Sequence, residues 1–197
     1  MTATALSSFS PSVRPPLLPE SDVSYAVEDT AVGRLLLAMT AEGRLVTSAY
    51  VPDSAAESAW LQRVADVVSP RVLRHPSRLD QVRRELAAYL DGRATGFSVT
   101  PDLALASAFQ RSVLTGLATQ VGYGASTTYG ELAAAIARPG AARAVGSALG
   151  ANPVCVVVPC HRVLPAGGSA GGNVGGYAGG PAAKSYLLAL EARRSAQ

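Results

Sequence analysis

Strand-type patterning is concentrated near the start of the chain, and helical periodicity dominates the rest. Two β-rich runs, GRLLLAMT (33–40) and RLVTSAYV (44–51), flank the turn residues Ala41-Glu42-Gly43 and predict an antiparallel hairpin. Residues 23–27 are a possible third strand. A small sheet followed by helices is typical of an α+β fold.

Two amphipathic segments follow the predicted hairpin. Residues 55–68 and 80–90 carry apolar side chains at helical spacing, and Asp91-Gly92 ends the second helix. The connector GFSVTPDLALA contains the breaker Pro101, so we place a domain boundary near 92–105. This predicts a Pro/Ser-rich disordered arm at 1–22, a first domain at 23–100 and a second domain at 101–197.

The second domain begins with a predicted helix at 106–120. Thr128 and Glu131 have the spacing of a capping box, which predicts a helix from Thr128 to about Ala137. Arg138-Pro139-Gly140 breaks it, and a second short helix, 141–149, stops at Gly150; this pair resembles a helix-turn-helix. A buried strand at VCVVV (154–158) and a closing helix at 183–194 complete the prediction.

Composition excludes several classes of protein. The chain of 197 residues is 48% hydrophobic and 16% charged, which is typical of a globular protein. No apolar run approaches the ~20 residues that span a bilayer. The first residues lack the basic start and the continuous apolar segment of a secretory signal, so such a signal is not expected. Two cysteines and two histidines, not at metal-ligand spacing, argue against a disulfide scaffold or a zinc site. We therefore expect a cytoplasmic protein without a metal.

The charge is unevenly distributed along the chain. Residues 1–100 hold ten Arg and eleven Asp/Glu, whereas residues 101–197 hold six Arg, one Lys and three Asp/Glu. The basic second half is where contact with a polyanion such as nucleic acid is expected, although the charge alone favours ordinary surface variation. In the helix 141–149, Arg143 stands among small side chains, which favours weakly sequence-specific contact with the minor groove. An αα-hairpin without a DNA role is the alternative.

Cys160 is the strongest candidate for chemistry. It follows the predicted strand 154–158 and precedes His161 and Arg162, a setting that can lower the pKa of a thiol. A buried structural thiol is the alternative. Cys155 lies inside the predicted strand, so its side chain is expected on the opposite face, without a disulfide to Cys160 and with a packing role.

The segment 152–163, NPVCVVVPCHRV, resembles the NP-x5-PCHRV signature of O6-alkylguanine-DNA alkyltransferases, also named methylated-DNA–protein-cysteine methyltransferases. Further elements similar to that family are FQR (109–111), TYGELA (128–133), RAVG (143–146), YAGG (177–180) and LLALE (187–191). The resemblance is strong over 109–191 and loose in the first half.

The resemblance implies a small ribonuclease H-like antiparallel-sheet domain and a winged-helix-like DNA-binding domain. It implies direct repair of O6-alkylguanine in duplex DNA, with O4-alkylthymine as a further candidate substrate. The alkyl group is transferred irreversibly to Cys160, once per molecule. No cofactor is implied. The partner is double-stranded DNA, contacted in the minor groove by a monomer, with cooperative assembly on DNA as an open question.

The family's roles carry over by matching position. Cys160 attacks the alkyl carbon of a flipped-out guanine, and His161, through a water to Glu191, removes the thiol proton. Asn152 holds the active-site turn, and Tyr129 donates toward guanine N3. Each residue also has a structural alternative. His161 could be a core histidine, Glu191 an ordinary charge on a helix face, and Tyr129 a residue that merely lies within the capping-box segment.

Further residues are expected to bind the base or the DNA. The carbonyls of Cys160 and Val163 accept the exocyclic amine, Tyr177 walls the pocket and the Ala178 N–H faces O6. Arg143 enters the base stack. Gly146 and Ser147 are assigned to the same DNA-contacting helix.

Two departures from the family pattern affect the pocket. The loop 165–176 is longer and richer in glycine, and Ala178 stands where many members have Ser. Lys184 is expected to be solvated, with a pocket or phosphate contact as the alternative, and His75 is expected at the surface. The rival functions are a non-catalytic lesion sensor, a helix-turn-helix regulator and a Cys-His hydrolase.

Overall fold

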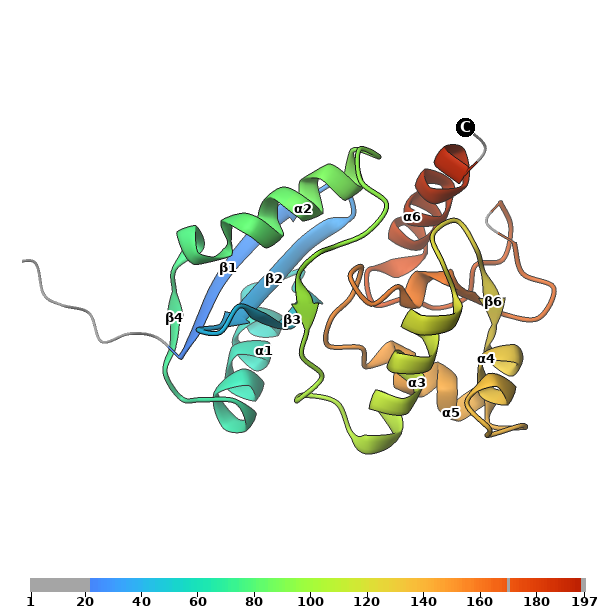
Figure 1. The fold of residues 1–197 in the computed structure, drawn as a ribbon, viewed down its shortest axis with the longest axis horizontal. Coiled ribbons are helices and arrows are strands. Elements are labelled where there is room, and N and C mark those ends of the chain that lie inside the picture. The colour runs from blue at the N-terminus through green and yellow to red at the C-terminus, as the bar shows by residue number, and fades with distance from the viewer. Residues whose placement is uncertain (1–21, 170, 196–197) are drawn as a thin grey trace, which may run out of the picture.

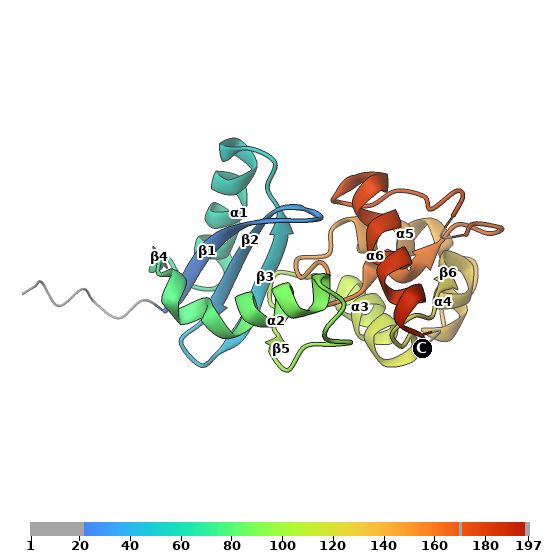
Figure 2. The ribbon, with the colours of Figure 1, turned by 90° about the horizontal axis from the view of Figure 1, so that it is seen from above.

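A computed structural model of the chain describes residues 22–169 and 171–195. Figures 1 and 2 show a sheet half followed by a helical half that lies beside it. Except for Asp22, the arm expected at 1–22 lies outside the described residues. The mixed α+β architecture predicted from the sequence is confirmed.

The first half is built on a five-stranded sheet. Its central strands are β1 (Val23–Thr30), β2 (Gly33–Thr40) and β3 (Arg44–Tyr50), paired antiparallel as the hairpin pattern predicted. Two short strands, β4 (Val72–Arg74) and β5 (Thr100–Pro101), add parallel edges in the order β4-β1-β2-β3-β5. They have too few residues for an alternation pattern, so the sequence analysis missed them.

Helices cover both faces of this sheet. In Figure 2, α1 (Ser54–Val67) and α2 (Asp80–Leu90) lie on opposite sides of the strands. A 3-10 turn at Pro76–Leu79 leads into α2. Residues from Leu35 to Met39 of β2 are all buried, because consecutive side chains meet α2 on one face and α1 on the other.

The second half is mainly helical. It contains α3 (Ala108–Gln120), α4 (Tyr129–Ala135), α5 (Ala142–Gly150) and α6 (Gly180–Ser195). The capping box predicted at Thr128 and Glu131 is confirmed, although α4 ends two residues earlier than expected. A short parallel pair, β6 (Thr127–Thr128) and β7 (Val163–Leu164), joins the start of α4 to the segment after Cys160.

The predicted strand at 154–158 is wrong. Val157 N–H donates to the Cys155 carbonyl at 2.9 Å and Val156 has φ +70°, so the chain makes a γ-turn at Val156. Pairing with β3 is limited to the backbone of Ser48, which accepts from Cys155 N–H at 2.7 Å. The apolar run is buried because both halves enclose this turn, and burial alone does not distinguish a strand from such a turn.

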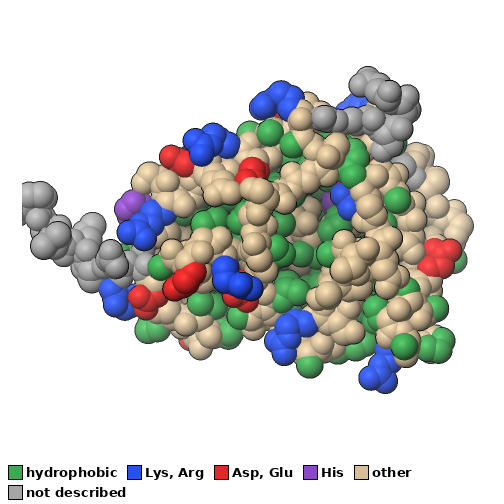
Figure 3. Space-filling view, in the orientation of Figure 1, with side chains coloured by type: hydrophobic (Ala, Val, Ile, Leu, Met, Phe, Trp, Pro, Cys, Tyr) green, Lys and Arg blue, Asp and Glu red, His purple; other side chains and the backbone are tan. Residues whose placement is uncertain are grey.

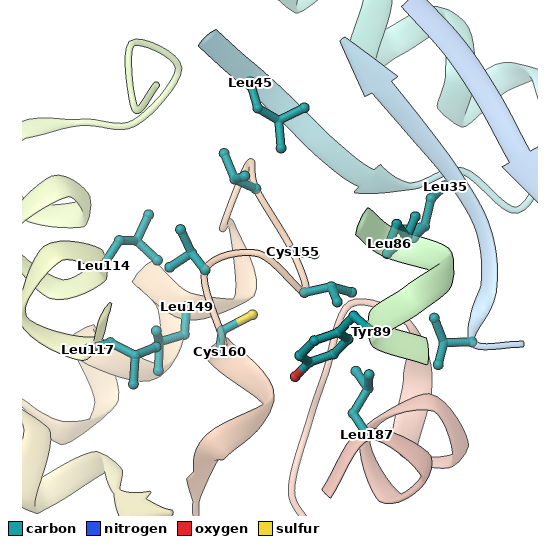
Figure 4. Close-up of a cluster of buried hydrophobic side chains, with 14 of the residues drawn as sticks. Leu35, Leu45, Leu86, Tyr89, Leu114, Leu117, Leu149, Cys155, Cys160 and Leu187 are labelled. Carbon is teal, nitrogen blue, oxygen red and sulfur yellow. The ribbon is translucent and has the colours of Figure 1, made fainter. Parts of the chain in front are cut away.

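One hydrophobic core crosses from the first half to the second. Leu35 and Leu86 of the first half belong to the same cluster as Leu114, Leu149 and Cys155 of the second (Figure 4). Within the described residues, none of the helices is long and apolar enough to cross a membrane. Lys and Arg side chains are scattered over the face shown in Figure 3 rather than gathered in one patch.

Candidate active site

Asn152 is the centre of the turn that carries Cys160. Its buried side chain donates from Nδ2 to the Val158 carbonyl at 3.0 Å and to Cys160 Sγ at 3.1 Å, while Oδ1 accepts from Val154 N–H at 2.9 Å. One amide thus satisfies backbone groups that would otherwise need strand partners. The side chain therefore fixes both the turn and the sulfur.

Cys160 begins a 3-10 turn, Cys160–Arg162, at the wall of a cavity of about 410 Å³. Cys160 is a free cysteine, and the residue is 5% exposed. The cavity brings together several predicted site residues; its lining is Tyr129, Gly146, Leu149, Gly150, Cys160, Gly176, Tyr177 and Ala178. Such a cavity suits a planar ring held beside the thiol.

Cys155 does not point away from Cys160, so the expectation of opposite faces is wrong. The γ-turn at Val156 brings the two thiols close enough to interact, and Cys155 Sγ donates to the Asn152 carbonyl oxygen at 3.4 Å. The neighbouring Cys155 thiol lowers the pKa of the Cys160 thiol, assisted by Asn152 and Lys184 against burial. Both cysteines are free.

His161 is fully buried and faces Glu191 of α6. Nε2 lies 2.6 Å from Glu191 Oε1, a direct contact where the sequence analysis expected a bridging water. Burial lowers the pKa of His161 despite the attraction of Glu191, so the imidazole is neutral at pH 7. Because Nε2 donates to the carboxylate, Nδ1 carries the lone pair, and it has no hydrogen-bond partner among the described protein atoms.

Besides His161, the residues Arg162, Gly124 and Tyr89 donate to the Glu191 carboxylate. Arg162 Nε donates to Oε2 at 2.9 Å, Gly124 N–H donates to Oε2 at 2.9 Å, and the Tyr89 hydroxyl donates to Oε1. Arg162 also donates to the Val121 carbonyl at 2.8 Å. Burial opposes ionisation of Glu191, but His161, Arg162 and Tyr89 outweigh it and lower its pKa to about 2. Glu191 is therefore a buried carboxylate rather than an ordinary helix-face charge.

Lys184 is fully buried, so the expectation of a solvated side chain is wrong. Nζ donates to the Val163 carbonyl at 2.6 Å and to the Gly176 carbonyl at 3.4 Å, and it lies 5.8 Å from the centre of the Tyr129 ring. Lys184 thereby ties β7 to the end of the loop 165–176. The sequence signal was its place on the inner face of α6, four residues from Leu188.

Tyr177 reaches the cavity with support from the first half. Its hydroxyl lies 3.3 Å from the Tyr50 hydroxyl of β3, and the two rings make an edge contact at 5.5 Å. Gly179 packs against the same Tyr50 ring, whose nearest atom would lie 2.4 Å from an added Cβ. The sequence analysis missed Tyr50 because no local pattern links it to residues more than a hundred positions away.

The predicted DNA-contacting residues lie on one face of α5. Arg143 and Ser147 are exposed, and Gly146 packs beneath them near the Tyr129 ring. They line an open groove of about 700 Å³ next to the cavity, together with Thr128, Tyr129, Gly130, Ala142, Pro165 and Ala166. Ala178 is exposed at the cavity mouth, and His75 is exposed in the first half.

Side chains that could bind a metal are not clustered in the described part of the chain. Across residues 22–169 and 171–195, no set of three or more His, Cys, Asp and Glu side chains could hold a metal ion.

Comparison with known sequences finds one matching family profile and several similar proteins. The family profile described as "6-O-methylguanine DNA methyltransferase, DNA binding domain" matches residues 108–193. The methylated-DNA–protein-cysteine methyltransferase of Mycolicibacterium paratuberculosis is 38% identical over 177 residues, covering 88% of this chain and 94% of that protein. The inducible enzyme of that name from Bacillus subtilis is 40% identical over 120 residues, covering 61% and 64%.

Solved structures are similar over nearly the same span. Mycobacterium tuberculosis OGT in complex with DNA matches with a TM-score of 0.71 and 34% identity, covering 87% of this chain and 94% of that one. The O6-methylguanine-DNA methyltransferase of Pyrococcus kodakaraensis matches with a TM-score of 0.62 at 24% identity, covering 86% and 98%, and shares the fold.

Proposed function

Since the chain belongs to the methylated-DNA–protein-cysteine methyltransferase family, whose members repair DNA by moving an alkyl group to their own cysteine, we propose that Cys160 is the acceptor. The observation that carries this assignment is the position of Cys160. It is the cysteine that lines the cavity, its thiol pKa is lowered, and Asn152 holds its sulfur. Cys155 lies behind it in the buried core.

The proposed reaction is a displacement at the alkyl carbon. The Cys160 sulfur forms a bond to that carbon as the carbon–oxygen bond breaks, and the electron pair leaves with the guanine oxygen. The thiol proton passes to Nδ1 of His161, which is unprotonated and without a protein partner. Tyr129 lines the cavity and donates a proton toward the departing base at N3, because burial keeps its hydroxyl protonated.

The proposed substrate is O6-alkylguanine in duplex DNA, with O4-alkylthymine as a further candidate. A guanine enters the cavity only after leaving the base stack, and exposed Arg143 lies beside the cavity, where it can fill the space left in the stack. The small residues beside Arg143 on α5 permit close approach to the minor groove. The Val163 carbonyl, which accepts from Lys184, keeps a second lone pair for the exocyclic amine of guanine.

We assign the two halves as separate domains with a boundary near residue 100. A ribonuclease H-like description of 23–100 draws support from the sheet with helices on both faces. A winged-helix-like description of 101–197 draws support from α4, α5 and the adjacent β6–β7 pair. We propose that the protein acts as a monomer without a cofactor. Each molecule acts once, because a thioether is a poor leaving group.

Intact-mass measurement tests the proposed function. Wild-type protein and Cys160→Ser are incubated with a duplex that contains one O6-methylguanine and with a matched unmodified duplex. We expect the wild-type protein to gain one methyl group from the modified duplex and none from the unmodified duplex. Cys160→Ser should gain none from either duplex and should bind DNA as the wild type does. Methyl gain by Cys160→Ser, or binding without transfer by wild type, contradicts the proposal; the latter outcome is that of a lesion sensor.

A further inference from the structure

Tyr89 is a residue of the first half that reaches the candidate proton relay in the second. It lies in α2, is 1% exposed, and its hydroxyl donates to Oε1 of Glu191, 102 positions further along the chain. Figure 4 shows its ring among the buried side chains of the core that both halves share. No sequence motif indicates a role for Tyr89, and the proposed reaction does not use it.

Packing from both halves holds the Tyr89 ring. The Phe97 ring of the first half packs against it at a tilt of 34° with ring centres 4.9 Å apart, and Tyr123 of the second half makes an edge contact at 5.9 Å. A ring fixed in this way keeps its hydroxyl at one place on the carboxylate. Burial and the neighbouring Glu191 charge raise the pKa of Tyr89, so the hydroxyl stays protonated and remains the donor.

Oε1 of Glu191 is the oxygen that also receives His161 Nε2. A carboxylate oxygen orients its donors best when its own position is fixed, and hydrogen bonds to charged acceptors are among the stronger ones in proteins. Arg162 holds the edge of the carboxylate through Nε and the terminal nitrogen Nη2. Tyr89 donates to Oε1 from the first half, whereas His161 and Arg162, which contact the same oxygen, belong to the second half.

We propose that Tyr89 is a positioning residue for alkyl transfer. Its hydroxyl holds Glu191 so that His161 keeps Nε2–H on the carboxylate and leaves Nδ1 to accept the proton of Cys160. This inference rests on the proposed role of Cys160. It makes the first half a working part of the reaction centre rather than a support for the DNA-binding half.

Removing the hydroxyl has a directional effect on His161. The charged groups that act on this imidazole are Glu191, which favours its protonation, and Arg162 and Lys184, which oppose it; Tyr177 and Cys160 also lie against it. Without Tyr89 O–H, less of the Glu191 charge is compensated at Oε1. The pKa of His161 therefore rises, and protonated His161 accepts no proton from the thiol. Transfer should slow, and its acidic limb should move to higher pH.

The test compares Tyr89→Phe with Tyr186→Phe. Tyr186 of α6 is a matched control, because its hydroxyl also joins the halves, donating to the Leu90 carbonyl at 3.1 Å. The rate constant for methyl transfer from an O6-methylguanine duplex is measured from about pH 5.5 to 8.5, with thermal unfolding of each variant alongside. We expect Tyr89→Phe to be roughly fivefold slower near neutral pH, with its acidic limb shifted upward. Tyr186→Phe should stay within about twofold, without a shift.

A second readout is independent of the reaction. The chain has two histidines, so an NMR titration follows His161 directly, with exposed His75 as an internal reference. We expect the His161 pKa to rise in Tyr89→Phe and to stay unchanged in Tyr186→Phe. An unchanged His161 titration in Tyr89→Phe overturns the inference, as do equal changes in both variants that follow their loss of stability. If Cys160 of the wild type gains no methyl group, the proposed function fails, and the titration still decides the link from Tyr89 to His161.

Discussion

Gly179→Ala should press a methyl group into the Tyr50 ring and disturb the cavity wall from behind. An ideal Cβ at this position would lie 2.4 Å from Cζ and 2.5 Å from Cε1 of Tyr50. Carbon atoms in contact prefer about 3.5–4.0 Å, so the ring must move by roughly 1 Å. Tyr50 contacts Tyr177 through both rings and both hydroxyls, so this movement reaches the cavity.

Two opposing effects set the magnitude. Overpacking of this kind destabilises by about 1–3 kcal/mol. The φ of Gly179 is not left-handed, so alanine can adopt it without strain. Alanine also lowers the conformational entropy of the unfolded chain, which stabilises the folded protein by about 0.4–1 kcal/mol. The net loss is about 1–2 kcal/mol, which for a protein of this size lowers Tm by about 2–8 °C. Methyl transfer should slow as well, because Tyr177 lines the cavity.

Thermal unfolding and methyl transfer are measured together for Gly179→Ala. Gly122→Ala is the matched control, because nothing lies within 4 Å of an added Cβ there and its φ is ordinary; it should leave Tm unchanged or raise it slightly. In a Tyr50→Val background the ring atoms are absent, so adding Gly179→Ala should cost little further stability. An equal loss with and without the Tyr50 ring would refute the steric reasoning.

Three further changes probe other parts of the site. Arg143→Ala should slow repair in duplex DNA about tenfold or more and change the reaction with free O6-benzylguanine less than about twofold, because the free base needs no flipping; equal slowing would place Arg143 in the pocket. Glu191→Gln leaves buried Arg162 without its charge partner and should cost about 3 kcal/mol at neutral pH. The folded pKa of Glu191 is about 2 against an ordinary 4.5, so the gap in Tm between wild type and this variant should narrow as pH falls from about 4.5 toward 2; a constant gap would contradict the assigned ionisation. Cys155→Ala removes the neighbouring thiol that most lowers the pKa of Cys160, so the alkylation rate at pH 7 should fall roughly fivefold and its pH profile should shift upward. Cys155→Ser, which keeps a polar donor at this position, should resemble wild type, and identical profiles for both variants would exclude this role.

Local signals in the sequence predicted most of the helices and the central strands. The capping box at Thr128 and Glu131 and the hairpin around Gly43 depend on neighbours within a few residues, and both are confirmed. The run 154–158 could not be assigned in this way. Its backbone partners are the Asn152 amide and the Ser48 backbone, and no apolar pattern reports a polar side chain that replaces a neighbouring strand.

The residues of the candidate site also differ in whether local sequence could identify them. Asn152, Cys160, His161 and Glu191 were identified through motifs, and the structure brings them together around one turn and one helix. Tyr50 and Tyr89 were missed, because each reaches the site across the contact between the halves. Cys155 was misplaced with the strand that was expected to hold it.

The most direct test of the central claim maps the methyl group after reaction with an excess of O6-methylguanine duplex. Cys155 and Cys160 lie between Arg143 and Arg162, on one tryptic peptide, so fragment ions must separate them. We expect one methyl group per molecule, carried by Cys160, with Cys155 unmodified and no further turnover. A methyl group on Cys155, or more guanine repaired than protein present, would contradict it.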